Sequence, residues 1–228
     1  MRTAAESHEV AARRLRRAVA GEVHLPGDDA YDAQRQPLHP TIDPRPAMVV
    51  EASGAADVRA AVVAARDYDL PLAVQATGHG THVPADGAIL LRTSDMATVL
   101  VDPDRGVARV GAGAVWGDVV AAAAPFGLAP LSGSSPDVGV TGYTLGGGVG
   151  WLARRHGFAA DSLLRAEVVT ADGSIVTATA TITLTSSGPS AAVAAASAWS
   201  LRWSCVCTRW PRSTPAQRAS PSIARPTR

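Results

Sequence analysis

The alternation of apolar and polar positions along residues 47–178 predicts short strands and helices. Residues 47–51 form an apolar run typical of a strand, residues 55–68 have the spacing of a helix, and residues 72–75 suit a second strand. Ser53 stands where it could cap the helix. A strand, a helix of this length and another strand predict a parallel crossover unit.

Beyond this unit the same pattern predicts a mixture of strands and one more helix. The candidate strands are residues 88–92, 98–101 and 107–110, the candidate helix is 115–124, and residues 167–170 and 174–178 form a candidate hairpin. The Asp172-Gly173 pair at the turn of this hairpin is a strong turn signal. We therefore expect an α+β fold of two small lobes.

The two ends of the chain differ from this central part. Residues 1–37 predict an amphipathic cytoplasmic helix and a leading segment, since no apolar signal core follows the N-terminal arginines. Residues 38–180 carry the folded pattern, and residues 181–228 form a basic tail rich in Ser, Pro and Arg, expected to be irregular and disordered. Apolar runs are far shorter than the ~20 residues of a membrane span, so no membrane contact is expected.

Charge and cysteine content narrow the possible partners. The formal net charge of +1 argues against nucleic acid as a partner. All acidic residues lie at or before Asp172, however, and the tail alone holds six arginines. Cys205 and Cys207 are too close for an easy disulfide and too few for a zinc site, so no metal is expected.

A first candidate for chemistry is the run Ala-Thr-Gly-His-Gly-Thr-His at residues 76–82, directly after a predicted strand. Glycines there let backbone N–H groups approach an anion, and a Thr hydroxyl adds a donor, as in a pyrophosphate cradle. A tight turn with a surface histidine is the alternative. The run alone does not decide between them.

A second candidate is the glycine-rich segment of residues 132–150. Seven glycines lie between Gly133 and Gly150, which argues against a helix or a central strand because each costs about 1 kcal/mol relative to Ala. A flexible linker would not be interleaved with Val138, Tyr143 and Leu145. No Gly-Lys-Ser/Thr of a Walker loop is present. We expect a flat or charged ligand against this backbone.

Four ordered motifs carry a family resemblance. They are Gly-His-Gly at 78–80, Gly-Ala-Gly-Ala-x-Trp-Gly-Asp at 111–118, Ser-Ser-Pro-x-Val-Gly-x-x-Gly-Tyr-x-x-Gly-Gly-Gly-x-Gly-Trp at 134–151, and Ala-Glu-Val-Val-Thr-Ala-Asp-Gly at 166–173. Together they resemble the PCMH-type FAD-binding domain of the vanillyl-alcohol-oxidase and berberine-bridge-enzyme-like oxidoreductases. The resemblance spans about residues 38–178.

The resemblance implies FAD as cofactor, with His79 bonded covalently to the flavin 8α-methyl carbon. Bicovalent members carry a cysteine at the place of Ser135, so a single attachment is implied here. The other implied cofactor-binding residues are Thr77, Gly78, Gly80, Thr81, His82, Ser134, Ser135, Asp137, Val138, Gly139, Gly142, Tyr143, Gly146, Gly147, Gly148 and Gly150.

The implied reaction is hydride transfer from a small-molecule substrate to the flavin, with oxygen or another electron acceptor. The family's base, commonly a tyrosine, matches none of Tyr31, Tyr68 and Tyr143, so the catalytic residue is unassigned. Substrate and oligomeric state are left open. A non-catalytic flavin-binding module or an inactive truncated product is the alternative, and a cell-wall reductase with non-covalent flavin is disfavoured by His79.

The tail departs from the family pattern. When residues 182–200 are reverse-translated and read two bases later, an allowed codon choice gives His-Pro-Asp-Leu-Leu-Trp-Ala-Val-Arg-Gly-Gly-Gly-Gly-Ser-Phe-Gly-Val-Val, the next flavin contact expected from the resemblance. The hypothesis is a change of reading frame near residues 178–182, so that the substrate half is missing. A genuine basic tail that binds nucleic acid through its Arg and Trp residues is the alternative.

Overall fold

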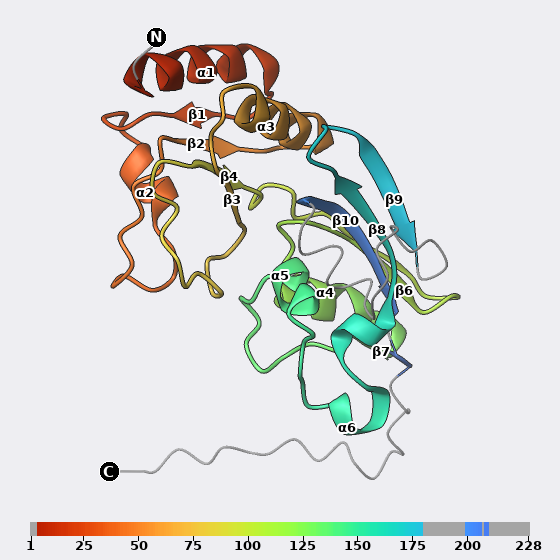
Figure 1. The fold of residues 1–228 in the computed structure, drawn as a ribbon. Coiled ribbons are helices and arrows are strands. Elements are labelled where there is room, and N and C mark those ends of the chain that lie inside the picture. Colours follow the sequence, from red (N-terminus) through yellow and green to blue (C-terminus); the bar gives the residue numbers. More distant parts are fainter. Residues whose placement is uncertain (1–3, 180–198, 207, 210–228) are drawn as a thin grey trace, which may run out of the picture.

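The computed structural model describes residues 4–179, 199–206 and 208–209, and these form two lobes, each built on its own sheet (Figure 1). The first lobe holds a four-stranded sheet in the order β1-β2-β4-β3. Its strands are β1 (Val23–His24), β2 (Met48–Glu51), β3 (Leu72–Gln75) and β4 (Ile89–Arg92).

The predicted crossover unit is present, with one strand inserted into it. Helix α3 (Ala55–Asp67) links β2 to β3, and both strands run parallel to β4, which lies between them. Leu90 of β4 is therefore opposite Val49 on one side and Ala73 on the other. The apolar run 88–92 suits this central place because both faces of β4 are covered, Ile89 and Leu91 packing in one buried cluster and Leu90 in another.

The core of the first lobe lies between the sheet and two helices. Helix α1 (Ala4–Ala18) and α3 lie side by side over one face of the sheet in Figure 1, and both contribute to one buried apolar cluster with β2 and β4. Leu15 of α1 is buried in this cluster. On the opposite face, Tyr31 of the short helix α2 (Tyr31–Arg35) packs against Val49 and Leu90.

The start of α3 differs from the expectation for Ser53. The residue at the cap is Gly54, with no side-chain cap hydrogen bond, and the Ser53 hydroxyl donates to the Asp57 carboxylate instead. Asp57 is 3% exposed and also accepts from the backbone N–H groups of Ala20 and Gly21. Burial alone would raise the pKa of Asp57, but these hydrogen bonds outweigh it and lower the pKa. The carboxylate thus ties the end of α1 to α3.

The second lobe contains a five-stranded antiparallel sheet in the order β5-β6-β10-β8-β9. Its strands are β5 (Val99–Asp102), β6 (Val107–Gly111), β8 (Leu163–Val169), β9 (Ile175–Thr179) and β10 (Trp199–Val206). The short strands β7 (Leu128–Ala129) and β11 (Thr208–Arg209) pair separately. Helices α4 (Trp116–Ala123), α5 (Val140–Leu145) and α6 (Ala153–His156) and two 3-10 turns, at Ala124–Phe126 and Ala159–Ser162, complete the lobe.

The two lobes meet along α3 and the turn of the predicted hairpin. Arg59 and Arg66 of α3 donate hydrogen bonds to the carbonyls of Gly173 and Asp172, each at 2.9 Å. Val169 at the end of β8 is buried in the core of the first lobe. These contacts fix the two sheets relative to each other beside the site described below.

Two expectations differ from the structure. Residues 199–206 and 208–209 of the tail are extended and paired: β10 lies between β6 and β8, and β11 pairs with β7. The glycine-rich segment contains the short helix α5, since Val140 and Thr144 are buried there and tertiary packing outweighs the poor helix propensity. The predicted change of reading frame, Cys207 and the remaining tail lie outside the described residues. Within the described part, no helix is long and apolar enough to cross a membrane.

Candidate functional site

The site lies where two loops approach each other. Residues 76–82 follow β3 of the first lobe, and residues 132–139 lead into α5 of the second lobe. Together with neighbouring side chains they border a cavity of about 730 Å³. This volume falls in the range of ~300–1,000 Å³ that is usual for ligand pockets.

The cavity brings together residues from both glycine-rich motifs. The predicted site residues that line it are Thr77, Gly78, His79, Gly80, Thr81, His82, Val138, Gly139, Gly142 and Tyr143. The predicted residues outside the lining are Ser134, Ser135, Asp137, Gly146, Gly147, Gly148 and Gly150. For the lining and the non-lining residues alike, contact with FAD stays a prediction. Some of the non-lining residues hold lining residues in place.

The loop after β3 can only follow its path with glycine at position 78. Gly78 has φ +80°, and a Cβ there would lie 2.8 Å from the backbone nitrogen of Leu38. Both facts disfavour any side chain. The loop is therefore pressed against the segment that precedes β2, and its other edge faces the cavity.

His79 is held between the two loops. Its Nδ1 lies 3.0 Å from the Thr77 hydroxyl oxygen, and its Nε2 lies 3.3 Å from a carboxylate oxygen of Asp137. The Ser135 hydroxyl donates to the other Asp137 oxygen at 2.6 Å. This hydrogen bond, with a smaller contribution from His79, lowers the pKa of Asp137. Asp137 is therefore ionised at neutral pH and faces the imidazole as an anion.

Tyr143 forms part of the cavity wall on the side of α5. Its ring meets Trp116 of α4 edge to face, with centroids 5.5 Å apart. Behind the ring, a Cβ at Gly148 would lie 2.6 Å from Tyr143 Cε1. Burial raises the pKa of Tyr143, so its phenol stays protonated at neutral pH. The protonated phenol can donate a hydrogen bond, but it cannot take up a proton as a phenolate would.

Several lining residues, including Gln75 and Thr141, were not among the predicted site residues. Gln75 is the last residue of β3, where its amide oxygen accepts from the Thr81 hydroxyl at 3.3 Å. Its side-chain nitrogen donates to the backbone carbonyl of Gln36. Both residues adjoin the recognised motifs in the sequence, and only this closeness could have indicated them as lining residues. The buried hydroxyl of Thr141 has no hydrogen-bond partner within the described residues.

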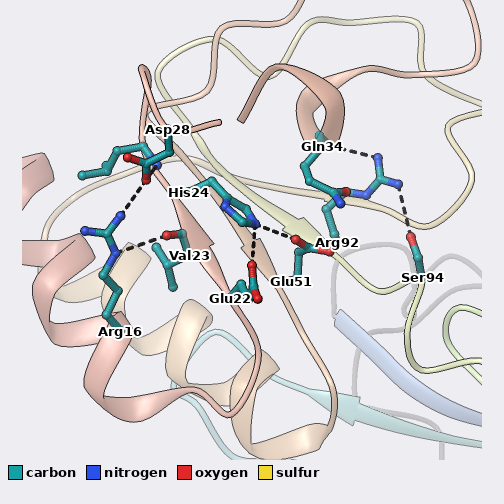
Figure 2. Close-up of polar contacts among 10 residues, drawn as sticks. Arg16, Glu22, Val23, His24, Asp28, Gln34, Glu51, Arg92 and Ser94 are labelled. Carbon is teal, nitrogen blue, oxygen red and sulfur yellow. Dashed lines mark hydrogen bonds and ion pairs between the residues drawn. The ribbon is translucent and has the colours of Figure 1, made fainter. Parts of the chain in front are cut away.

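A separate polar cluster surrounds His24, which carried no pattern in the sequence. Figure 2 shows His24 Nε2 facing the carboxylates of Glu51 and Glu22. The nitrogen lies 2.5 Å from the Glu51 oxygen and 3.6 Å from the Glu22 oxygen. Arg92 lies nearby and donates to the Gln34 carbonyl at 3.1 Å. Burial lowers the pKa of Arg92, and the charge of Glu51 opposes this. The cluster joins β1, β2 and β4 across the sheet, a contact between distant residues that spacing cannot reveal.

Comparison with known proteins agrees with this geometry. A family model described as an FAD binding domain matches residues 46–179, more than half of the chain. The (R)-6-hydroxynicotine oxidase of Paenarthrobacter nicotinovorans is 37% identical over 160 residues, which cover 69% of this chain and 35% of that protein. An uncharacterised FAD-linked oxidoreductase of Bacillus subtilis (strain 168) is 34% identical, over 70% of this chain and 36% of that protein.

Solved structures show the same fold. The 6-hydroxy-D-nicotine oxidase of Arthrobacter nicotinovorans superposes with a TM-score of 0.76 at 30% identity, over 84% of this chain and 43% of that one. A variant of BBE-like 1 from Physcomitrella patens gives a TM-score of 0.75 at 22% identity, over 86% and 44% of the two chains. The chain thus spans about a third of the length of the curated relatives it matches.

These findings define a flavin-binding domain of α+β fold. The chain belongs to the FAD binding domain family, and the resemblance to the PCMH-type domain of the vanillyl-alcohol-oxidase and berberine-bridge group is confirmed. FAD as the cofactor of this domain is likewise confirmed.

The residues of the cavity fit this cofactor. The backbone N–H groups of residues 78–80 donate to no other residue in the part of the chain that the structure describes, so they are available to phosphate oxygens. The unpartnered hydroxyls of Thr141 and Tyr143 add two hydrogen-bonding groups at the wall. An extended ligand with several polar groups would satisfy both the N–H groups of the loop and the hydroxyls of the wall, and its apolar rings would fill the rest of the cavity.

Proposed function

We propose that this chain is the flavin-binding part of an FAD-dependent oxidoreductase, with its flavin attached covalently through His79. The observation that carries the proposal is the position of His79 at the wall of the cavity between both glycine-rich loops. Flavin, when bound, supplies the hydride acceptor of such a reaction. The chain's own residues bind the cofactor, orient it and restrict water at the cavity.

Within the proposal, each group has a distinct task. The loop at 78–80 receives the pyrophosphate on its N–H groups, and Thr141 and Tyr143 donate hydrogen bonds to polar edges of the cofactor. His82 is exposed at the mouth of the cavity and lies among the cofactor loop residues without a catalytic task. Gly146 and Gly147 connect the end of α5 to Gly148. Ser134 lies before α5 and Gly150 lies after Gly148, in the same glycine-rich segment.

The substrate is a small molecule and the electron acceptor is oxygen. The 37% identical relative and the 30% identical solved structure are both named oxidases, which supports oxygen. The substrate class is proposed no further than a small molecule with a carbon that can give up a hydride, since the chain matches only about a third of its relatives' length. We also propose that residues 38–180 form the FAD-binding domain.

A second candidate is a flavin-binding module without catalysis. It is favoured by Tyr143, the only tyrosine that lines the described cavity, because its buried phenol stays protonated at neutral pH and so offers no phenolate to accept a proton. Absorption spectroscopy in the presence of candidate reductants separates the two proposals. Bleaching of the flavin band under anaerobic conditions, followed by recovery in air, supports the oxidoreductase. Bound flavin that no amine, alcohol or sugar bleaches supports the module.

A further inference from the structure

A chain of polar contacts crosses the gap between the two glycine-rich loops. It runs from the Ser135 hydroxyl to Asp137 at 2.6 Å, from Asp137 to His79 Nε2 at 3.3 Å, and from His79 Nδ1 to the Thr77 hydroxyl at 3.0 Å. Thr77 and His79 belong to the first lobe, whereas Ser135 and Asp137 belong to the second. The imidazole therefore has a carboxylate at one nitrogen and a hydroxyl at the other.

This arrangement decides where the proton of a neutral His79 lies. A neutral imidazole has one N–H and one lone pair, and a carboxylate can only accept a hydrogen bond. The carboxylate of Asp137 therefore favours the N–H on Nε2. The Thr77 hydroxyl can donate to Nδ1, which matches a lone pair at that nitrogen. The nitrogen that carries the lone pair is the nucleophilic one.

We propose that Asp137, held by Ser135, is a positioning residue that keeps the proton on Nε2 of His79 and leaves Nδ1 to form the bond to the flavin 8α carbon. This inference rests on the proposed function, and specifically on a covalent flavin at His79. It gives a task to Ser135, which stands where bicovalent relatives carry a second attachment.

The bond formation can be balanced with groups already named. The hydrogen bond from the Thr77 hydroxyl to Nδ1 breaks, the freed Nδ1 lone pair makes the new N–C bond, and one C–H bond of the 8α-methyl group breaks. The methyl proton goes to solvent, while the two electrons of that C–H bond pass into the ring system and then to dioxygen. With the methyl proton and the proton released from Nε2, dioxygen becomes hydrogen peroxide. His79 turns cationic as the N–C bond forms.

Asp137 thus acts twice on the same ring. Before the bond forms it fixes the tautomer, and during bond formation its negative charge stabilises the developing imidazolium. The pair contributes little to folding, because the side chains of His79 and Asp137 are 23% and 64% exposed and exposed pairs are worth little. Substitution of Asp137 should therefore spare the fold.

The test uses the full chain, freed of flavin and mixed with FAD in air, with intact mass recorded against time. At an FAD concentration that saturates its own non-covalent site, we expect Asp137→Asn to gain covalent FAD about 10–100 times more slowly than the unchanged protein, the range found when the hydrogen-bond partner of a metal-ligating histidine is removed. Asp137→Glu should recover part of the rate. The control Asp104→Asn, an exposed carboxylate in the turn between β5 and β6, should match the unchanged protein.

The outcomes separate the inference from the proposed function. If Asp137→Asn gains covalent FAD as fast as the unchanged protein, or if the purified flavopeptide is joined through Nε2, the inference is overturned and the covalent flavin stands. If the unchanged protein gains no covalent FAD, both the inference and the covalent part of the proposed function fail. Slow attachment in Asp137→Asn, rescue by Asp137→Glu and a bond at Nδ1 support the inference together.

Discussion

Replacement of Gly148 by alanine should loosen the wall of the cavity that Tyr143 forms. Gly148 has φ +74°, and an added Cβ would lie 2.6 Å from Tyr143 Cε1 and 2.7 Å from the Ala159 Cβ. Neither neighbour is the far end of a flexible chain. The Tyr143 ring also touches Trp116, so it cannot retreat without disturbing α4.

The expected cost has two parts. A left-handed backbone conformation costs a residue with a Cβ about 1–2 kcal/mol, and forcing an extra methyl into a packed place costs about 1–3 kcal/mol. The matched control is Gly127→Ala, because Gly127 has φ +66° and nothing within 4 Å of the added Cβ. Gly127→Ala should therefore show only the first part, and Gly148→Ala should show both.

Urea unfolding followed by tryptophan fluorescence gives the two free energies, and FAD titration gives the two affinities. We expect Gly148→Ala to lower the free energy of unfolding by about 2–5 kcal/mol and to weaken FAD binding. Gly127→Ala should lose about 1–2 kcal/mol with unchanged affinity. Equal losses in stability, or unchanged FAD affinity in Gly148→Ala, would refute the close packing against Tyr143.

Three further predictions test other parts of the structure. Glu51→Gln should lower the free energy of unfolding by about 1–3 kcal/mol in urea, because His24 is buried beside it, while Glu22→Gln, at a 78% exposed side chain, should change it little. The Asp172 carboxyl should titrate near 2 by NMR, because hydrogen bonds from Thr170 first and then from Ser174 lower its pKa to about 2. The stability that these hydrogen bonds add is present above the unfolded pKa of 3.8 and is lost as the pH falls through about 2. A titration midpoint near 3.8 would contradict this. Removal of residues 199–228 should expose the edges of β6 and β8 and cause aggregation on size exclusion, whereas an unchanged elution profile would argue against β10 as the central strand.

Much of the fold could be predicted from local pattern. The apolar runs gave the strands β2, β3, β4 and β6 within a residue or two, and Asp172-Gly173 gave the hairpin of β8 and β9. The hydrophobic pattern does not predict the order of the strands in the sheet. Strand β4 lies between β2 and β3 because of tertiary pairing. The helix α5 was missed for a related reason, because its stability comes from burial and not from propensity.

The candidate site divides in the same way. Glycine spacing located both loops that line the cavity, and the ordered motifs implied FAD before any geometry was known. The contact between His79 and Asp137 joins residues 58 positions apart, and no spacing rule connects them. The Ser135 hydroxyl was considered only as a missing attachment point, whereas its contact with Asp137 emerges from the fold. The change of reading frame stays a prediction that gene sequencing tests.

The most direct test of a covalent FAD domain is the absorption spectrum of the purified chain after acid precipitation, with intact mass of the same sample. We expect a yellow precipitate that carries one FAD per chain, and a colourless precipitate at the mass of the bare chain for His79→Ala. A colourless precipitate from the unchanged protein, even after incubation with FAD in air, would contradict attachment at His79.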